Sequence, residues 1–219
     1  MTEMFPGHES QESSGPHVEI EAAYESFVPE EFKSSPLTYF ESHGTNIKQG
    51  EILYDENGTV REDPTAVKDL PVWTNTEGRE LHTVGKRVNI SKGKVARAND
   101  PFYEYGIMEY VQSKGLPGAK PIAKASENGA HLIVMERVPG LRWSYRKTLL
   151  KQGFTNNDVE LMHKKAEAMM AELQKRFEAH GITRSWKLSD MIFDIDVEHK
   201  DLRALVPVDW ERTEIVPTA

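Results

Sequence analysis

The chain of 219 residues contains no cysteine. That absence excludes a disulfide framework, a thiolate metal site and a cysteine nucleophile. No apolar run approaches the roughly 20 residues that a membrane-spanning helix needs. The first residues, MTEMFPGHESQESSG, have neither a basic start nor an apolar stretch, so they do not resemble a secretory signal peptide. We therefore expect a cytoplasmic protein without a membrane partner, while export by a route that needs no signal peptide stays open.

Positive charge is also scarce. The chain has 27 Lys and Arg against 35 Asp and Glu, which gives a net charge of -8. Nucleic acids and anionic membranes attract basic surfaces, so we expect neither as a partner. A hydrophobic content of 38% is typical of a folded protein, and the length suits one or two domains. The oligomeric state stays open.

The first third of the chain carries no recognisable chemistry. Residues 1–20 are polar and rich in Ser, Glu, Gly and Pro, which predicts a disordered tail. Residues 21–69 hold a short helical pattern before Pro29 and the hairpin signal Asn57-Gly58. We expect this second segment to be an N-terminal extension that packs on the rest of the chain.

Within residues 70–139, apolar and polar side chains alternate at Val72-Trp73, at 80–84 and at 88–97, which predicts a small antiparallel sheet. Gly78 and Gly85 stand at the expected turns, and the third strand is expected within 88–97. Asp100-Pro101 then predicts the start of a helix, because aspartate caps the first turn and proline suits the first helical position.

That helix is expected to end at Gly115, and the apolar run His131–Met135 predicts a buried strand. The chain then passes through a connector, Glu136–Gly140, into residues 140–219. Strands first, helices next and a hairpin last are typical of a two-lobed α+β fold.

The second half combines one long helix with one hairpin. Thr155 to Asp158 forms a capping-box pattern, and apolar residues at helical spacing follow as far as Ala179. The apolar segments Met191–Phe193 and Leu205–Val208 then predict the two strands of a hairpin.

Two acidic residues, Asp190 and Asp209, stand at the open ends of this hairpin. Phosphoryl transfer depends on metal ions held by fixed acidic or amide groups, and carboxylate oxygens suit Mg²⁺. We therefore predict both residues as metal ligands. Two structural alternatives stay open: Asp190 caps the local turn, and Asp209 pairs with an arginine such as Arg212.

The motifs around these residues resemble a known superfamily. Thr183-Arg184-Ser185, followed by Asp190, is similar to the catalytic loop of the protein kinase and aminoglycoside phosphotransferase superfamily, and Asp209-Trp210-Glu211 is similar to its metal-binding motif. The resemblance implies a protein kinase-like fold, with a small antiparallel N-lobe sheet in 70–139 and a truncated helical C-lobe in 140–219.

The resemblance also implies a nucleotide site for ATP and Mg²⁺. Lys94, on the third expected strand, would contact the α- and β-phosphates and pair with Glu104 on the following helix. Lys92 is the alternative if the strand register is shifted. Glu136 and Val138 would meet the adenine ring. The alternative is that Lys94 and Glu104 are solvated surface charges and that the connector is an ordinary strand end.

Two departures affect activity. Ser185 stands where the superfamily has its catalytic aspartate, and a serine hydroxyl does not accept a proton near neutral pH without a base of its own. Gly78 is the one glycine at a suitable distance before Lys94, so a repeated-glycine phosphate loop is missing from this region.

These departures lead to three expectations about function. The first is a pseudokinase, or a strongly impaired phosphotransferase, that acts through a protein partner. The second is an active atypical kinase that transfers the γ-phosphate of ATP to a protein or small-molecule hydroxyl. The third is an interaction module that binds no nucleotide.

Overall fold

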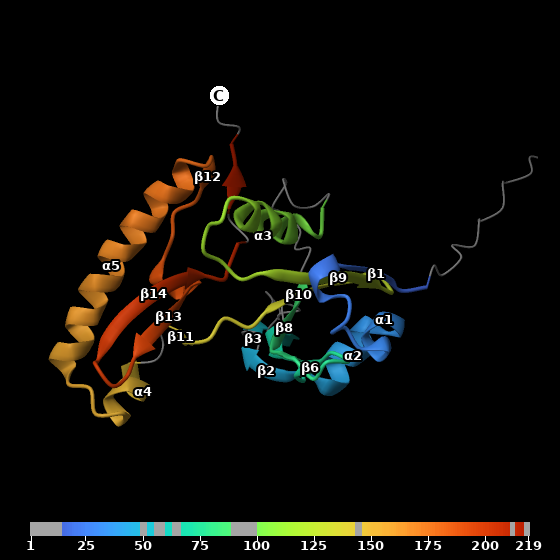
Figure 1. Cartoon of the computed structure of the whole chain (residues 1–219), viewed down its shortest axis with the longest axis horizontal. Helices are drawn as coiled ribbons and strands as arrows, with labels where there is room; N and C mark the ends of the chain where they lie inside the picture. The colour runs from blue at the N-terminus through green and yellow to red at the C-terminus, as the bar shows by residue number, and fades with distance from the viewer. Residues whose placement is uncertain are drawn as a thin grey trace, which may run out of the picture.

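In the computed structural model, a six-stranded antiparallel sheet forms the larger part of an α+β fold (Figure 1). The structure describes residues 15–48, 52–54, 60–62, 67–88, 100–142, 146–210 and 213–216. The strand order of the large sheet is β1-β9-β10-β8-β5-β2. Its strands are β1 (His17–Ile20), β2 (Thr45–Lys48), β5 (Val67–Asp69), β8 (Thr83–Val88), β9 (Pro121–Glu127) and β10 (Ala130–Glu136).

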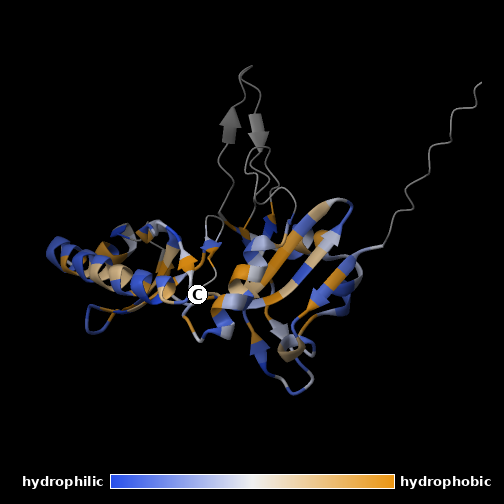
Figure 2. Ribbon diagram, turned by 90° about the horizontal axis from the view of Figure 1, so that it is seen from above, coloured by the Kyte–Doolittle hydropathy of each residue, from blue (hydrophilic) through white to orange (hydrophobic). Residues whose placement is uncertain are grey.

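Both faces of the large sheet are covered, because its central strand alternates its buried side chains between two cores. Leu132 and Val134 of β10 belong to the core shared with α1 (Glu30–Ser34) and α2 (Pro36–His43). Ile133 and Met135 belong to the core shared with α3 (Tyr103–Ser113). Leu132 to Met135 are accordingly all buried, and hydrophobic residues recur along the strands of the large sheet in Figure 2.

The expected turn at Gly85 is wrong. Gly85 lies in the middle of β8, where a Cβ atom would come within 2.7 Å of the Phe40 ring. The glycine therefore permits the close approach of α2 to the sheet, a packing role that a local turn pattern does not reveal. Gly78, in contrast, has φ +75° between β6 (Trp73–Thr74) and β7 (Glu80–Leu81), as a turn glycine should.

A smaller sheet and a long helix make up the rest of the described fold. The strands β11 (Leu141–Arg142), β13 (Met191–Asp196) and β14 (Asp201–Pro207) form a three-stranded sheet, against which α5 packs (Figure 1). The remaining elements are α4 (Arg146–Lys151), α5 (Asn156–Glu178), a pair formed by β12 (Ile182–Thr183) and β15 (Glu214–Ile215), a pair formed by β3 (Ile52–Tyr54) and β4 (Val60–Glu62), and the 3₁₀ turns η1 (Ala22–Tyr24) and η3 (Leu188–Asp190).

Four elements expected from local signals are present: two helices, a hairpin and a buried strand. Helix α3 begins at Tyr103 with Phe102 as its N-cap, two residues after the predicted cap Asp100, so Pro101 does not hold the first helical position. The Asp100 carboxylate instead accepts a hydrogen bond from the Phe102 amide at 2.8 Å, and Gly115 follows the helix with φ +63°. Thr155 Oγ1 accepts from the amide of Asp158, whose carboxylate accepts from the Thr155 amide at 2.7 Å, so the capping box precedes α5 as predicted. The hairpin β13–β14 and the strand β10 are also present.

The predicted segment boundaries differ from the structure. Residues 17–20 form β1 instead of belonging to a tail, and β2 and β5 place parts of the predicted extension in the same sheet as β8. Strand β9 was not expected. Each of these strands owes its place to pairing with distant residues, such as His17 with Ser126, and most of 88–97 lies outside the described residues.

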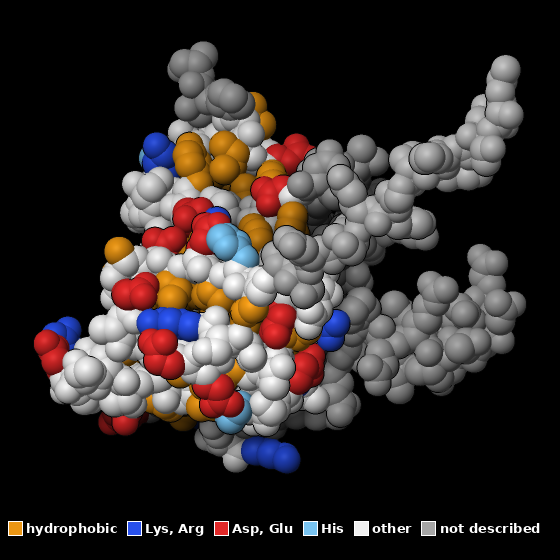
Figure 3. All heavy atoms as spheres, turned by 90° about the vertical axis from the view of Figure 1, so that its right-hand side faces the viewer, with side chains coloured by type: hydrophobic (Ala, Val, Ile, Leu, Met, Phe, Trp, Pro, Cys, Tyr) orange, Lys and Arg blue, Asp and Glu red, His pale blue; other side chains and the backbone are white. Residues whose placement is uncertain are grey.

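Helix α3 is hydrogen-bonded to the segments that precede β12 and β15. Its Tyr110 hydroxyl donates to the carbonyl of His180 and its Tyr103 hydroxyl donates to the carbonyl of Thr213, both at 3.0 Å. The core that includes α3 continues into α5 and the β13–β14 hairpin. On the face drawn in Figure 3, acidic side chains outnumber basic ones, in keeping with the net charge. Among the described helices, none has the length and apolar character of a membrane span.

Candidate functional site

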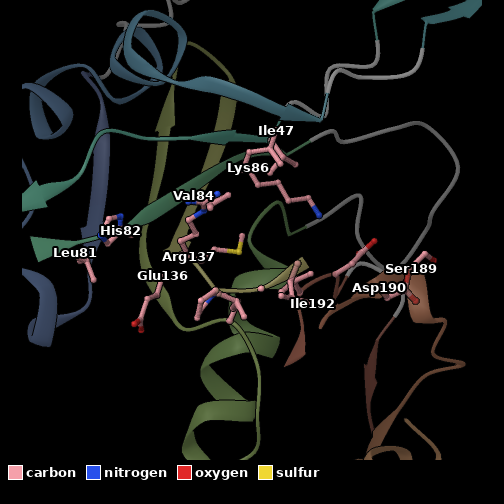
Figure 4. Close-up of a pocket in the computed structure, with 18 of the residues that line it drawn as sticks. Ile47, Leu81, His82, Val84, Lys86, Glu136, Arg137, Ser189, Asp190 and Ile192 are labelled. Atoms are coloured by element: carbon pink, nitrogen blue, oxygen red, sulfur yellow. Dashed lines mark hydrogen bonds between the residues drawn. The ribbon is translucent and has the colours of Figure 1, made fainter. Parts of the chain in front are cut away.

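A cavity of about 840 Å³ lies between the large sheet and the open end of the β13–β14 hairpin. Val84 and Lys86 of β8 lie on one side of it (Figure 4), and Met135 of β10 also lines it. Asp190 and Asp209 line the other side. The structure therefore brings both predicted metal ligands to one cavity, opposite a strand lysine.

The strand lysine is Lys86, not the expected Lys94. Its Nζ donates to both carboxylate oxygens of Glu104 on α3, at 3.0 and 2.7 Å. The side chains of Lys86 and Glu104 are only 9% and 8% exposed, so this is a buried ion pair. Glu104 Oε1 also accepts a hydrogen bond from the Trp210 amide at 3.1 Å, which joins α3 to the end of the hairpin.

Glu104 therefore pairs with a strand lysine, but this lysine comes earlier in the chain than the expected Lys94. Lys92 and Lys94 lie outside the described residues. Lys86 is flanked in the sheet by Ile133 of β10 and Val67 of β5. A charged residue between apolar neighbours on a central strand indicates a buried charge that needs a partner. The sequence alone does not reveal this, because the neighbours are known only once the strand order is known.

Gly78, the one glycine noted at a suitable distance before Lys94, lies outside the large sheet. With Lys86 as the strand lysine, the two strands beyond β8 in the sheet are β5 and β2. Residues 49–66 connect them and are described only at β3 and β4. Gly78 belongs instead to the β6–β7 turn.

Arg184 connects the two acidic residues of the hairpin. Its Nη2 lies 2.9 Å from Asp190 Oδ2, its Nη1 lies 3.8 Å from Asp209 Oδ1, and it donates to the Asp209 carbonyl. Its side chain is 4% exposed and stacks over the Trp186 ring, with Cζ 4.6 Å from the ring centroid. Sequence reasoning used Arg184 only as part of a motif and missed this contact.

Both structural alternatives for the acidic residues are therefore partly realised. Asp190 Oδ2 accepts from the Lys187 amide at 3.0 Å, so Asp190 does cap the local turn. The arginine near Asp209 is Arg184, while Arg212 lies outside the described residues. Asp209 is 44% exposed and Asp190 is 13% exposed, so Asp209 presents more of its carboxylate to solvent.

The end of the hairpin is fixed by aromatic packing. Trp210, which follows Asp209, is fully buried, with its ring centroid 5.8 Å from Phe177 and 5.2 Å from Trp186. Ser185, next to Trp186, is exposed and does not line the cavity. The position of the expected catalytic aspartate is thus held near the site by its neighbour but carries no carboxylate.

The connector after β10 forms a third side of the cavity. Glu136 and Val138, the two connector residues predicted to meet an adenine ring, both line the cavity. The Arg137 amide donates to the His82 carbonyl at 2.8 Å, which fixes the connector against the residue that precedes β8. Glu136 lies 3.2 Å from Lys120 Nζ, and this bond raises the pKa of Lys120.

The fit of these residues to Mg²⁺ depends on Arg184. Two carboxylates, with phosphate oxygens, are a donor set that Mg²⁺ accepts. In this structure, however, Asp190 Oδ2 is occupied by a guanidinium and a backbone amide, and the same guanidinium approaches Asp209. Within the described residues, no three metal-ligating side chains form a group.

No protein-family model matches the chain, and a search of curated proteins returns no match either.

Proposed function

We propose that the protein binds an adenine nucleotide in the cavity between the large sheet and the hairpin, in the manner of a protein kinase-like fold, and has lost efficient phosphoryl transfer. The observation that carries the proposal is the buried Lys86–Glu104 pair, which opens on a cavity faced by Asp209. Protein kinases use a strand lysine paired with a helix glutamate at the phosphates, and an aspartate at the metal.

The order of the elements supports the same proposal. Lys86 lies on the third strand of the large sheet counted from β2, and α3 supplies Glu104. The connector 137–140 then leads to the three-stranded sheet, whose hairpin supplies both acidic residues. A two-lobed fold that binds a nucleotide between its lobes would need its strand lysine, helix glutamate, connector and acidic hairpin in this order along the chain.

The walls of the cavity suit a flat ring with a polar edge. Val84, Met135 and Ile192 contribute apolar surface, while the connector contributes backbone groups. Ligand cavities typically measure about 300 to 1,000 Å³ and combine apolar walls with a few polar groups. The volume of about 840 Å³ is sufficient for a nucleotide.

The loss of phosphoryl transfer follows from Ser185. No carboxylate stands at this position, and losing a general base costs about 10²- to 10⁴-fold in rate. Under this proposal the protein is a pseudokinase, and nucleotide occupancy acts on a protein partner by stabilising the site.

The proposal is tested by filling the cavity. Val84→Trp places an indole among the apolar walls, and Val72→Trp is a matched control because Val72 is 43% exposed and does not line the cavity. We expect ATP with Mg²⁺ to stabilise the natural protein and the control against heat. A ligand at about 100 times its Kd adds about 2.7 kcal/mol. We expect no such stabilisation of the Val84→Trp variant.

Failure of ATP and ADP to stabilise the natural protein would refute nucleotide binding and favour an interaction module. Stabilisation of the Val84→Trp variant to the same extent would place the ligand elsewhere. Transfer of radiolabelled γ-phosphate to the protein itself, or to a general acceptor protein, would instead support the active atypical kinase.

A further inference from the structure

Arg184 occupies an unusual place in the candidate site. The guanidinium is buried beneath the cavity, where it faces Asp190 directly and approaches both the carboxylate and the carbonyl of Asp209. It does not line the cavity. The positive charge therefore comes from a buried side chain that is not part of the cavity lining.

The contacts of Arg184 hold it in this place. Its planar group stacks on Trp186, and Trp186 packs edge-to-face on Trp210, the residue after Asp209. Arginine keeps its charge at any relevant pH and offers several donors in a rigid fork, so one side chain can serve two carboxylates. Asp190 cannot turn away easily, because its Oδ2 is also bound to the Lys187 amide.

We infer that Arg184 is the charge partner of Asp190 and Asp209 in place of a divalent cation, so that the cavity binds an adenine nucleotide without Mg²⁺. The inference rests on the proposed function for its ligand, but its claim about the metal is independent of it. A dication would have to share two carboxylates with a fixed guanidinium, whose like charge opposes it. Arg184 is a positioning residue, since it does not touch the ligand.

The charges around the site explain what Arg184 does. Around the cavity the cationic residues are Lys86, Arg137 and Arg184, and the anionic ones are Glu80, Glu104, Glu136, Asp190 and Asp209, which leaves a net charge of -2. Removing Arg184 would make the site more negative by one charge, so the two carboxylates would then attract a cation from solution. With Arg184 in place, the third phosphate of ATP meets no dication, so it adds negative charge to an acidic site and we expect ATP to bind no more tightly than ADP.

The first experiment measures nucleotide binding by calorimetry, in excess EDTA and in excess Mg²⁺. We expect the Kd of the natural protein for ADP to change by less than about threefold between the two conditions, and the Arg184→Gln variant to bind about tenfold more tightly with Mg²⁺ than without it. Arg203→Gln is the matched control. Arg203 is 60% exposed and pairs with Asp196 near the hairpin tip, so this variant should behave like the natural protein.

The second experiment needs no nucleotide. Electron paramagnetic resonance counts free Mn²⁺, which substitutes for Mg²⁺ at oxygen ligands. We expect no Mn²⁺ bound to the natural protein or to Arg203→Gln, and one ion bound to Arg184→Gln. Arg184→Lys keeps the charge and should also bind none, which separates the charge from the shape of the side chain.

The outcomes distinguish the two proposals. Nucleotide binding that requires Mg²⁺ in the natural protein, or Mn²⁺ bound to it, overturns the role of Arg184 and leaves nucleotide binding standing. Absence of nucleotide binding in both buffers refutes the proposed function, and the Mn²⁺ measurement still decides the role of Arg184. If Arg184→Gln does not fold, the measurements on the natural protein and on Arg184→Lys decide the inference alone.

Discussion

The buried pair between Lys86 and Glu104 gives the strongest prediction for stability. Lys86→Met removes the ammonium but keeps a similar side-chain length, so the cavity wall stays filled. Glu104, whose side chain is 8% exposed, then loses the ammonium and keeps the hydrogen bond from the Trp210 amide. An uncompensated charge in such a place is expensive, because the protein interior cannot replace its hydration.

The expected magnitude follows from measured cases of this kind. Removing one partner of a buried ion pair costs about 3 to 5 kcal/mol. The hydrogen bond from Trp210 favours the lower end of that range. For a chain of this size, each kcal/mol lowers Tm by about 2 to 4 °C, so Lys86→Met should lower Tm by at least about 6 °C.

The assay is thermal and denaturant unfolding followed by circular dichroism, with two comparison variants. Lys165→Met breaks an ion pair with Asp201 whose side chains are 45% and 54% exposed, and should cost at most about 1 kcal/mol. The double variant Lys86→Met with Glu104→Gln removes the buried charge but keeps an acceptor for Trp210. It should be more stable than Lys86→Met alone.

Equal, small losses for Lys86→Met and Lys165→Met would refute the reasoning, because they would mean that the Lys86–Glu104 pair is solvated. A double variant less stable than Lys86→Met would refute it as well, since the penalty would then not come from the unpaired carboxylate.

The remaining predictions concern the connector and helix α3. Gly140 has φ +128°, and a Cβ there would collide with the Phe193 carbonyl, so Gly140→Ala should lower the free energy of unfolding by at least about 1 to 3 kcal/mol in denaturant titration. Gly106→Ala, within α3 and with open space at its Cβ, should instead raise it by up to about 1 kcal/mol, and a loss at both sites would contradict this explanation. Burial is the main cause that raises the pKa of Glu109, and a hydrogen bond with Glu21 is the second. The charge of Glu19 raises this pKa further, while the charge of Lys124 lowers it. A raised pKa means that the folded state loses stability as pH rises through it, so Glu109→Gln should be more stable than the natural protein at neutral pH. The advantage should fade below the ordinary value of 4.5, and an equal difference in Tm across this range would exclude the titration of Glu109 as its cause.

Local signals predicted several parts of the fold correctly. The capping box at Thr155 begins α5 because its hydrogen bonds join residues three apart, and the apolar spacing that follows fixes one face of the helix. The positions of Asp190 and Asp209 at the open end of the hairpin were also readable, because a hairpin pairs neighbouring strands in a single register.

Other parts depended on residues distant in sequence. The tail residues 17–20 become a strand because β9 offers them a free edge, and β9 itself was not expected. Gly85 looks like a turn residue until α2 is seen to pack against it. Strand propensity depends on cross-strand neighbours, so a single sequence identifies such strands poorly.

The sequence by itself determined the long helix, the hairpin and the two acidic residues at its end, because capping, periodicity and turn formation act over a few residues. Only the tertiary structure decided that Lys86 is the partner of Glu104, because that choice depends on the order of strands brought together from residues 45 to 136. The same holds for Arg184, whose charge is placed between Asp190 and Asp209 by the packing of Trp186 against Trp210. Long-range packing, and not local pattern, sets the electrostatics of this site.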